Sequence, residues 1–405
     1  MTKLWARKTL IAGLFLSIVL LFSSSAQAMN GVRLIGVGAL HRALGGAGVA
    51  KPLDTTAILL NPAGMNGVGQ RFDMGIMVGF PSVSMNSTTM GGNNTTSKDE
   101  GAILPNVSVV FPFLDDRLAF GLGSFVNCAF GVDYRASRLP TALTNNLYDT
   151  VSRYGLIKFI PALSYRIIDN LYVGAGLHIN YAFIHSNSAT AAAGFPETSG
   201  GGRFDPALGI GGNLGLIYQP LDWLSLGVTY TTRQYFEVFD RYKDVLLGSM
   251  DMPQEVAAGV TVTPFEGGLV LADFRWINWS GVGTLGNSPV NGGFGWRDQY
   301  VGMLGLQYDF DPKFTVPLTV RVGYNYGRTM IPNQFVYQNM LIPAITEHHI
   351  TAGVGYDLTE KIGLNVSYSH FLENTQTDDG TVNAPGGASM KMSANSFALQ
   401  LNVDF

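Results

Sequence analysis

A two-residue alternation of apolar with small or polar side chains recurs along this chain from residue 71 to the last residue. Between Leu171 and Phe183 every odd position is apolar, whereas Gly174, His178 and Asn180 stand at even positions. Successive side chains of a β-strand point to opposite faces, so this segment predicts a strand with one apolar face. Similar segments begin near 71, 102, 117, 153, 204, 223, 253, 268, 296, 316, 346, 361 and 391, which makes fourteen predicted strands.

The connections between these strands alternate in length. Short polar turns lie at 114–116, 168–170, 219–222, 264–267, 311–313 and 357–360. Longer segments rich in Gly, Ser, Asn, Thr and Pro lie near 87–101, 131–152, 187–203, 237–252, 280–295, 327–345 and 372–390. Outer-membrane barrels combine an even number of antiparallel strands with short periplasmic turns and long external loops. We therefore expect an all-β fold, a fourteen-stranded antiparallel transmembrane β-barrel over residues 71–405, with both termini in the periplasm.

The start of the chain has the features of a secretory signal peptide. Lys3, Arg7 and Lys8 precede an apolar stretch at 9–22, and a small-residue cleavage site follows at 26–28. The predicted signal peptide is residues 1–28. After it there is no run of the roughly 18 apolar residues that a membrane-spanning helix needs.

Residues 29–70 do not alternate, and they are rich in glycine and other small residues. Gly36, Gly38, Gly45, Gly46 and Gly48 have apolar residues between them, which favours compact packing over a solvated tail. A segment of this kind before the first strand is expected to fold into the lumen. We predict that it forms a plug, or hatch.

Charge and motifs argue against several other classes of function. Only 13% of the residues are charged, against about 25% in an average soluble protein. The formal net charge of −4 is not typical of a nucleic-acid-binding surface. The six histidines and the single Cys128 show no metal-ligand spacing, and no nucleotide loop is present. We expect no metal, no cofactor and no catalytic residues, although an outer-membrane lipid hydrolase, testable by ester hydrolysis, stays open as an alternative.

Parity along the strands predicts a set of charged side chains on the inner face: Asp73, Lys158, Arg233, Asp273, Arg275 and Arg321. One interpretation is that these residues form salt bridges that hold the barrel and the plug together. The other is that cations among them bind the carboxylate of a substrate beside apolar walls. The candidate contacts are Lys158, Arg233, Arg275 and Arg321.

Several segments resemble the FadL-type outer-membrane transporters of long-chain fatty acids and hydrocarbons. Residues 34–50 and 55–65 resemble the hatch of that family, and Asn61, Pro62 and Ala63 match its hatch motif. The resemblance continues at 252–260, 273–280 and 321–326 and in the closing strand. Phe405 at the end of that strand looks like the signal for the barrel assembly machinery. The resemblance covers the whole predicted mature chain.

This resemblance implies passive transport of a hydrophobic small molecule: a fatty acid, an alkane or an aromatic hydrocarbon. External loops would capture the molecule, a lumenal pocket would receive it, and a kink in the third strand would release it sideways. Here that strand is 117–130, and Gly121, Gly123 and Ser124 are the candidate lateral gate because glycine weakens regular strand pairing. We also expect a monomer that contacts outer-membrane lipid and lipopolysaccharide. A non-selective porin is the alternative, which conductance would distinguish.

Overall fold

The computed structural model describes residues 30–87, 92–98, 101–134, 151–186, 204–243, 246, 248–311, 316–382 and 386–405. The predicted signal peptide lies outside the described residues. So do most of the predicted loops at 131–152 and 187–203 and part of the predicted turn at 311–313.

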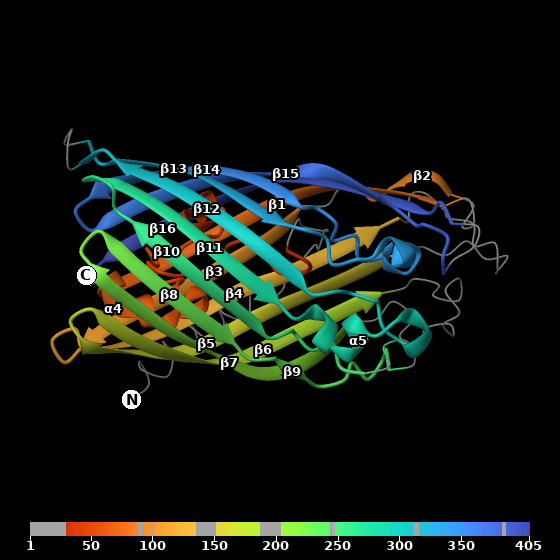
Figure 1. Cartoon of the computed structure of the whole chain (residues 1–405), viewed down its shortest axis with the longest axis horizontal. Helices are drawn as coiled ribbons and strands as arrows, with labels where there is room; N and C mark the ends of the chain where they lie inside the picture. The colour runs from red at the N-terminus through yellow and green to blue at the C-terminus, as the bar shows by residue number, and fades with distance from the viewer. Residues whose placement is uncertain are drawn as a thin grey trace, which may run out of the picture.

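Fourteen long antiparallel strands form a closed barrel in the described part of the chain (Figure 1). The first seven are β1 (Arg71–Ser87), β3 (Ala102–Phe113), β4 (Leu118–Asp133), β5 (Val151–Ile168), β6 (Leu171–Ser186), β7 (Phe204–Leu221) and β8 (Leu224–Thr231). The others are β10 (Glu255–Val262), β11 (Gly268–Ile277), β12 (Gln299–Asp309), β13 (Leu318–Gly327), β14 (His348–Thr359), β15 (Ile362–Thr377) and β16 (Ser389–Asp404). Pairing of β1 with β16 from Arg71↔Asp404 to Asn86↔Ser389 closes the barrel. The predicted fourteen-stranded barrel is confirmed.

Two short strands extend this wall at the end that carries the long loops. Strand β2 (Gly92–Thr96) pairs with the end of β1, and β9 (Tyr235–Phe236) pairs with β7. Short helical turns, including α5 (Gly283–Gly286), lie in the loops of the same end (Figure 1). No helix within the described residues is long and apolar enough to cross a bilayer.

The alternation of the sequence becomes an apolar outer face and a polar inner face. On β16, Phe397 is 51% exposed and Leu399 is 45% exposed, whereas Ser396 before them, Ala398 between them and Gln400 after them are buried. Ile76, the partner of Leu399 on β1, is also exposed. An apolar band on the outside and polar groups inside is the pattern of a barrel in lipid.

Residues 30–70 lie within the barrel, toward the end that carries the short turns (Figure 1). They form the short helices α2 (Ala39–Ala43), α3 (Ala57–Leu60), η1 (Pro62–Gly64) and α4 (Met65–Val68). Inward side chains from strands around the barrel bind this segment. Thr351 and Asn325 hydrogen-bond the N–H and C=O of Gly45, and Ser225 donates to the C=O of Ala50.

Inward glycines of the wall let this segment approach the strand backbone. A Cβ at Gly323 of β13 would overlap the backbone of Gly45, and one at Gly215 of β7 would overlap the side-chain oxygen of Asn61. Gly302 of β12, by contrast, has open space around its Cβ position. Part of the high glycine content therefore serves close packing between the wall and the N-terminal segment.

Candidate functional site

Strand β4 leaves regular pairing halfway along its length. Its ladder with β3 runs from Leu118 to Phe125 and stops there, at the pair Asn106↔Phe125. Its ladder with β5 shifts register between Val126 and Cys128, so Asn127 is an extra residue, a β-bulge. From Phe125 to Asp133 every residue is buried, whereas buried and half-buried residues alternate before it. Protein therefore covers both faces of the second half of β4.

Ser97 and Lys98, which follow β2, bridge the interruption between β3 and β4 at the far end of β4. Lys98 donates its backbone N–H to the carbonyl of Asp133 over 2.7 Å. The backbone N–H of Asp133 donates to the Ser97 hydroxyl over 3.0 Å. Ser97 in turn donates its N–H to Val83 of β1. The gap in β3–β4 pairing is therefore bounded by the β3–β4 ladder at one end and by the bonds of Ser97 and Lys98 at the other.

The bulge does not lie at the small residues that the sequence indicated. Gly121, Gly123 and Ser124 pair regularly with Val110, Ser108 and Val107. A Cβ at Gly121 would lie 2.5 Å from the sulfur of Met65, and one at Gly123 would overlap the ring of Phe125. These glycines serve close packing, so predicting irregular pairing at them was wrong: the irregularity lies at Asn127.

The tripeptide Asn61-Pro62-Ala63 joins the N-terminal segment to the wall at β7. Asn61 is extended, with φ −158° and ψ 101°, and its side-chain oxygen accepts the N–H of Ala63 at the start of η1. Its amide donates to the carbonyl of Val49 over 2.7 Å and to that of Leu216 over 3.3 Å. Because proline fixes its own φ and disfavours a helical residue before it, Pro62 supports this geometry. One fully buried side chain thus connects the turn, the segment and the wall.

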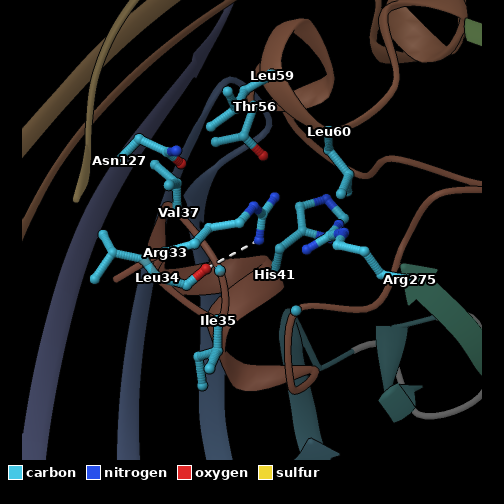
Figure 2. A pocket seen from close by; sticks show the side chains of 12 residues that line it. Arg33, Leu34, Ile35, Val37, His41, Thr56, Leu59, Leu60, Asn127 and Arg275 are labelled. Carbon is cyan, nitrogen blue, oxygen red and sulfur yellow. Dashed lines mark hydrogen bonds between the residues drawn. The ribbon is translucent and has the colours of Figure 1, made fainter. Parts of the chain in front are cut away.

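A small cavity lies between the N-terminal segment, the bulge of β4 and β11 (Figure 2). Its volume is about 20 Å³, room for about one water or small polar group. Its polar lining is Arg33, His41, Thr56, Asn127 and Arg275, and its apolar lining includes Leu34, Ile35, Val37, Leu59 and Leu60. Figure 2 shows the side chains of Arg33, His41 and Arg275 pointing toward one another.

Two arginines at this cavity share one carboxylate. The Nε of Arg33 lies 2.9 Å from Oε2 of Glu255, and the Nε of Arg275 lies 3.6 Å from the same oxygen. Arg33 also donates from Nη1 to the carbonyl of Leu34. Sequence reasoning missed Arg33, because it does not lie on a strand. It also missed Glu255 at the start of β10, although the strand alternation that indicated an inward Arg275 would have indicated an inward Glu255 too.

Lys158 and Asp273 lie near these arginines. Lys158, buried on β5, places Nζ 3.4 Å from Nδ1 of His178 and interacts electrostatically with Glu255 and Arg33. Asp273 accepts the N–H groups of Gly48 and Val49 on one oxygen, at 2.7 and 2.9 Å. Asp273 thus holds a turn of the N-terminal segment against β11. Asp73 does the same on β1, where it accepts the N–H of Thr55 at 2.7 Å.

The two other cations that parity indicated lie elsewhere. Arg321 is buried on β13, where it donates to Gln307 and Asn365, each over 2.7 Å. Arg233 follows the end of β8, pairs with Asp251 at 2.8 Å and lies over the ring of Tyr235.

Arg233 also lines an outer hollow of about 360 Å³ with Tyr230 and Tyr235, whose side chains are exposed on the outside. Its predicted inward position is therefore wrong, because strand parity no longer holds beyond Thr231, the last residue of β8.

One further buried cation, Arg42 of α2, anchors the segment to the opposite wall. Its guanidinium donates to the Ser396 hydroxyl over 2.7 Å and lies over the ring of Phe371. Burial lowers the pKa of Arg42 to about 9. Among the described residues no group of three or more His, Cys, Asp or Glu side chains is arranged to hold a metal ion.

The barrel is closed and residues 30–70 lie inside it (Figure 1). A comparison of the sequence with known families gives a consistent result. The model of the outer membrane protein transport protein family (OMPP1/FadL/TodX) matches residues 17–405. The chain belongs to this family. It is a family of outer-membrane transport proteins and not an enzyme family.

Solved structures show the same fold at low sequence identity. The Pseudomonas putida toluene transporter TodX has a TM-score of 0.70 at 20% identity, over 92% of this chain and 99% of that chain. A Pseudomonas aeruginosa FadL homologue gives 0.69 at 18%, over 93% and 100%. The Ralstonia pickettii toluene transporter TbuX gives 0.65 at 20%, over 92% and 99%. No curated protein matches the sequence significantly.

Proposed function

We propose that this protein carries hydrophobic molecules passively across the outer membrane and releases them sideways through the wall between β3 and β4. The observation that carries this proposal is the position of Asn127. It is the bulge residue of β4 at the interrupted ladder, and it also lines the lumenal cavity. The cavity and the interruption are therefore neighbours, so a molecule in the lumen would have a short route to the wall between β3 and β4.

The filled lumen supports a lateral exit over an axial one. Side chains of β1, β7, β8, β11, β13, β14 and β16 bind residues 30–70. Passage along the axis would require many of these bonds to break together, whereas the interruption at β4 has no β3–β4 ladder to break. The same filling argues against the alternative of a non-selective porin.

A sideways exit suits a hydrophobic molecule. Each methylene group moved from water to an apolar environment gains about 0.8 kcal/mol, so an alkyl chain favours the bilayer over a water-filled pore. Among related proteins, TodX and TbuX are described as toluene transporters. We propose a long-chain fatty acid or a hydrocarbon as the substrate, captured first on the long loops.

The proposal includes an orientation and a division of the chain. The C-terminus lies at the end of the barrel that carries the short turns (Figure 1), and such turns are periplasmic in outer-membrane barrels. We therefore place both termini in the periplasm, with residues 1–28 as signal peptide, 29–70 as hatch and 71–405 as barrel. The exposed apolar band would contact outer-membrane lipid, lipopolysaccharide would surround the long-loop end, and the protein would act as a monomer.

The bulge offers a direct test of lateral release. Deleting Asn127 removes the extra residue and restores one-to-one register between β4 and β5. We expect uptake of radiolabelled oleate and toluene to fall about tenfold, equal to roughly 1.4 kcal/mol of barrier. The matched control is Asn127→Ala, which keeps the residue count and therefore the bulge. Normal uptake by the folded deletion variant would contradict a lateral exit at this point.

A further inference from the structure

We propose that the outer hollow beside Arg233 binds the phosphorylated sugar head group of a glycolipid in the outer leaflet of the membrane. The hollow lies on the outside of the wall, near β9 and α5, at the end that carries the long loops (Figure 1). This inference goes beyond transport, because it concerns a lipid that surrounds the barrel and not a molecule that crosses the membrane. It uses the orientation proposed above, in which the long loops are external.

The outer face of the wall changes from apolar to polar at the level of the hollow. Tyr230, Val256 and Trp276 form one row of paired residues across β8, β10 and β11. Two positions nearer the loops, the same outward parity reaches Gln254 and Asn278. The Tyr230 hydroxyl donates to Gln254 over 2.9 Å, and the Gln254 amide donates to Asn278 over 3.1 Å. Because aromatic rows of barrels lie at the membrane–water interface, the hollow lies at the depth of lipid head groups.

A buried carboxylate holds the guanidinium group of Arg233 at this hollow. Nε and Nη2 of Arg233 lie 2.9 and 2.8 Å from Oδ2 of Asp251, whose other oxygen accepts the N–H of Phe236 over 2.9 Å. Nη1 donates to the carbonyl of Gly281 over 3.0 Å, and the guanidinium lies 5.4 Å from the ring centre of Tyr235. The Arg233 side chain is nevertheless 34% exposed. An oriented cation of this kind loses little conformational freedom when it binds a ligand.

The guanidinium group of Arg233 has donors left for a ligand. It carries five N–H groups, and the bonds to Asp251 and Gly281 use three of them. Two N–H groups therefore have no partner among the described residues. Paired arginine N–H donors match the oxygens of a phosphate, and such charge-assisted bonds are about twice as strong as neutral ones. The anionic groups at head-group depth in an outer leaflet of glycolipid are phosphates, so a phosphate is the ligand group that we assign to Arg233.

The size and lining of the hollow suit a sugar beside that phosphate. Its volume of about 360 Å³ equals roughly twelve waters at about 30 Å³ each. Tyr230 and Tyr235, which are 36% and 61% exposed, line it. Their rings offer apolar faces to the C–H groups of a sugar, and the second amide N–H of Gln254 is available to a sugar hydroxyl. A phosphate alone would leave most of this space empty, whereas an acyl chain alone would leave the Arg233 donors unused.

The test compares three lipids that separate the phosphate from the sugar. Lipid A has a phosphorylated glucosamine disaccharide, dephosphorylated lipid A has the sugar alone, and phosphatidylglycerol has a phosphate without an amino sugar. Binding of each lipid to the full-length protein in mild detergent is measured by native mass spectrometry over a concentration series. We expect the wild type to bind lipid A about tenfold more tightly than either of the other two lipids.

Arg233→Gln should weaken lipid A binding about tenfold and leave the binding of dephosphorylated lipid A unchanged. Because this change leaves the Asp251 carboxylate without its cation, a second variant combines it with Asp251→Asn, which keeps an oxygen for the N–H of Phe236. The double variant should show the same loss. The matched control is Arg241→Gln, which removes an arginine of the same loop that pairs with Asp205 and does not line the hollow. It should bind all three lipids as the wild type does.

Tyr235→Ala tests the sugar contact separately. It removes a ring that lines the hollow, so it should weaken the binding of lipid A and of dephosphorylated lipid A alike. Unchanged binding of both forms would overturn the assignment of a sugar to this hollow.

The other outcomes are equally decisive. Equal binding of lipid A and its dephosphorylated form by the wild type, or an unchanged preference in both Arg233 variants, would overturn the phosphate contact. Equally tight binding of phosphatidylglycerol, or displacement of lipid A by millimolar inorganic phosphate, would show a general anion site and overturn the glycolipid assignment. These measurements include no transport step. Normal uptake by the variant that lacks Asn127 would therefore contradict the proposed lateral release and leave the lipid site standing.

Discussion

The backbone N–H of Leu34 donates to the backbone carbonyl of Asn127 over 3.2 Å. This bond joins the N-terminal segment to the bulge of β4. Both residues also line the cavity that contains Arg33 and Arg275. A movement of the segment near Leu34 would therefore act on the bulge directly, without a chain of intermediate residues.

Leu34→Pro should weaken this connection, because proline has no N–H to donate. The expected loss is about 1 kcal/mol for one buried hydrogen bond. Hydrogen exchange should become faster at residues 30–36 and 126–130, while the barrel keeps its heat-modifiable gel mobility. Val37→Pro is the control, since the Val37 N–H forms no backbone bond within the described residues. Equal exchange in both variants would mean that the bond does not hold the bulge.

Asn61→Ala should loosen the segment at β7 by about 1–3 kcal/mol, because it removes a cap and an amide that donates to three carbonyls. We expect slower uptake of oleate at equal surface abundance with a folded barrel. Asn61→Asp keeps the oxygen that accepts the N–H of Ala63 but loses the amide N–H donors. Its uptake rate should therefore match that of Asn61→Ala if the contacts with the wall are important. If Asn61→Asp takes up oleate at the wild-type rate, only the bond that caps η1 is important.

Gly323→Ala should displace the segment from β13, since the added Cβ would overlap the backbone of Gly45. Overpacking of this kind costs about 1–3 kcal/mol. Limited proteolysis within residues 40–50 should become faster. Gly302→Ala on the neighbouring strand β12 meets open space and should have no effect. If Gly323→Ala and Gly302→Ala are both as resistant to the protease as the wild type, the N-terminal segment is not closely packed against the wall at Gly323.

Deletion of residues 29–70 should convert the protein to a conducting pore. The ladders from β1 to β16 close the wall without this segment, so we expect the truncated barrel to assemble. Planar bilayer recordings should give large, steady channels for the deletion and near silence for the full chain. An assembled but silent truncated barrel would show that the segment is not the plug.

The sequence by itself determined the barrel. Alternation with period two is a local property of strand backbone, so the start of each of the fourteen strands could be located within about three residues without knowledge of its partners. Turn and loop lengths then indicated closure into an up-and-down barrel. Parity also indicated that Lys158 and Arg275 face inward, because both lie within regular strands.

Only the tertiary structure decided the site. Arg33 and Glu255 are 222 positions apart in the sequence and meet because barrel closure brings β10 beside the N-terminal segment. Arg233 turned outward because it follows the end of a strand, where alternation no longer constrains it. The bulge formed at Asn127, where the carbonyl meets Leu34, and not at Gly121, where packing against Met65 requires a glycine. Strand positions follow from local backbone geometry, whereas contacts across the lumen depend on which surfaces the closed barrel brings together.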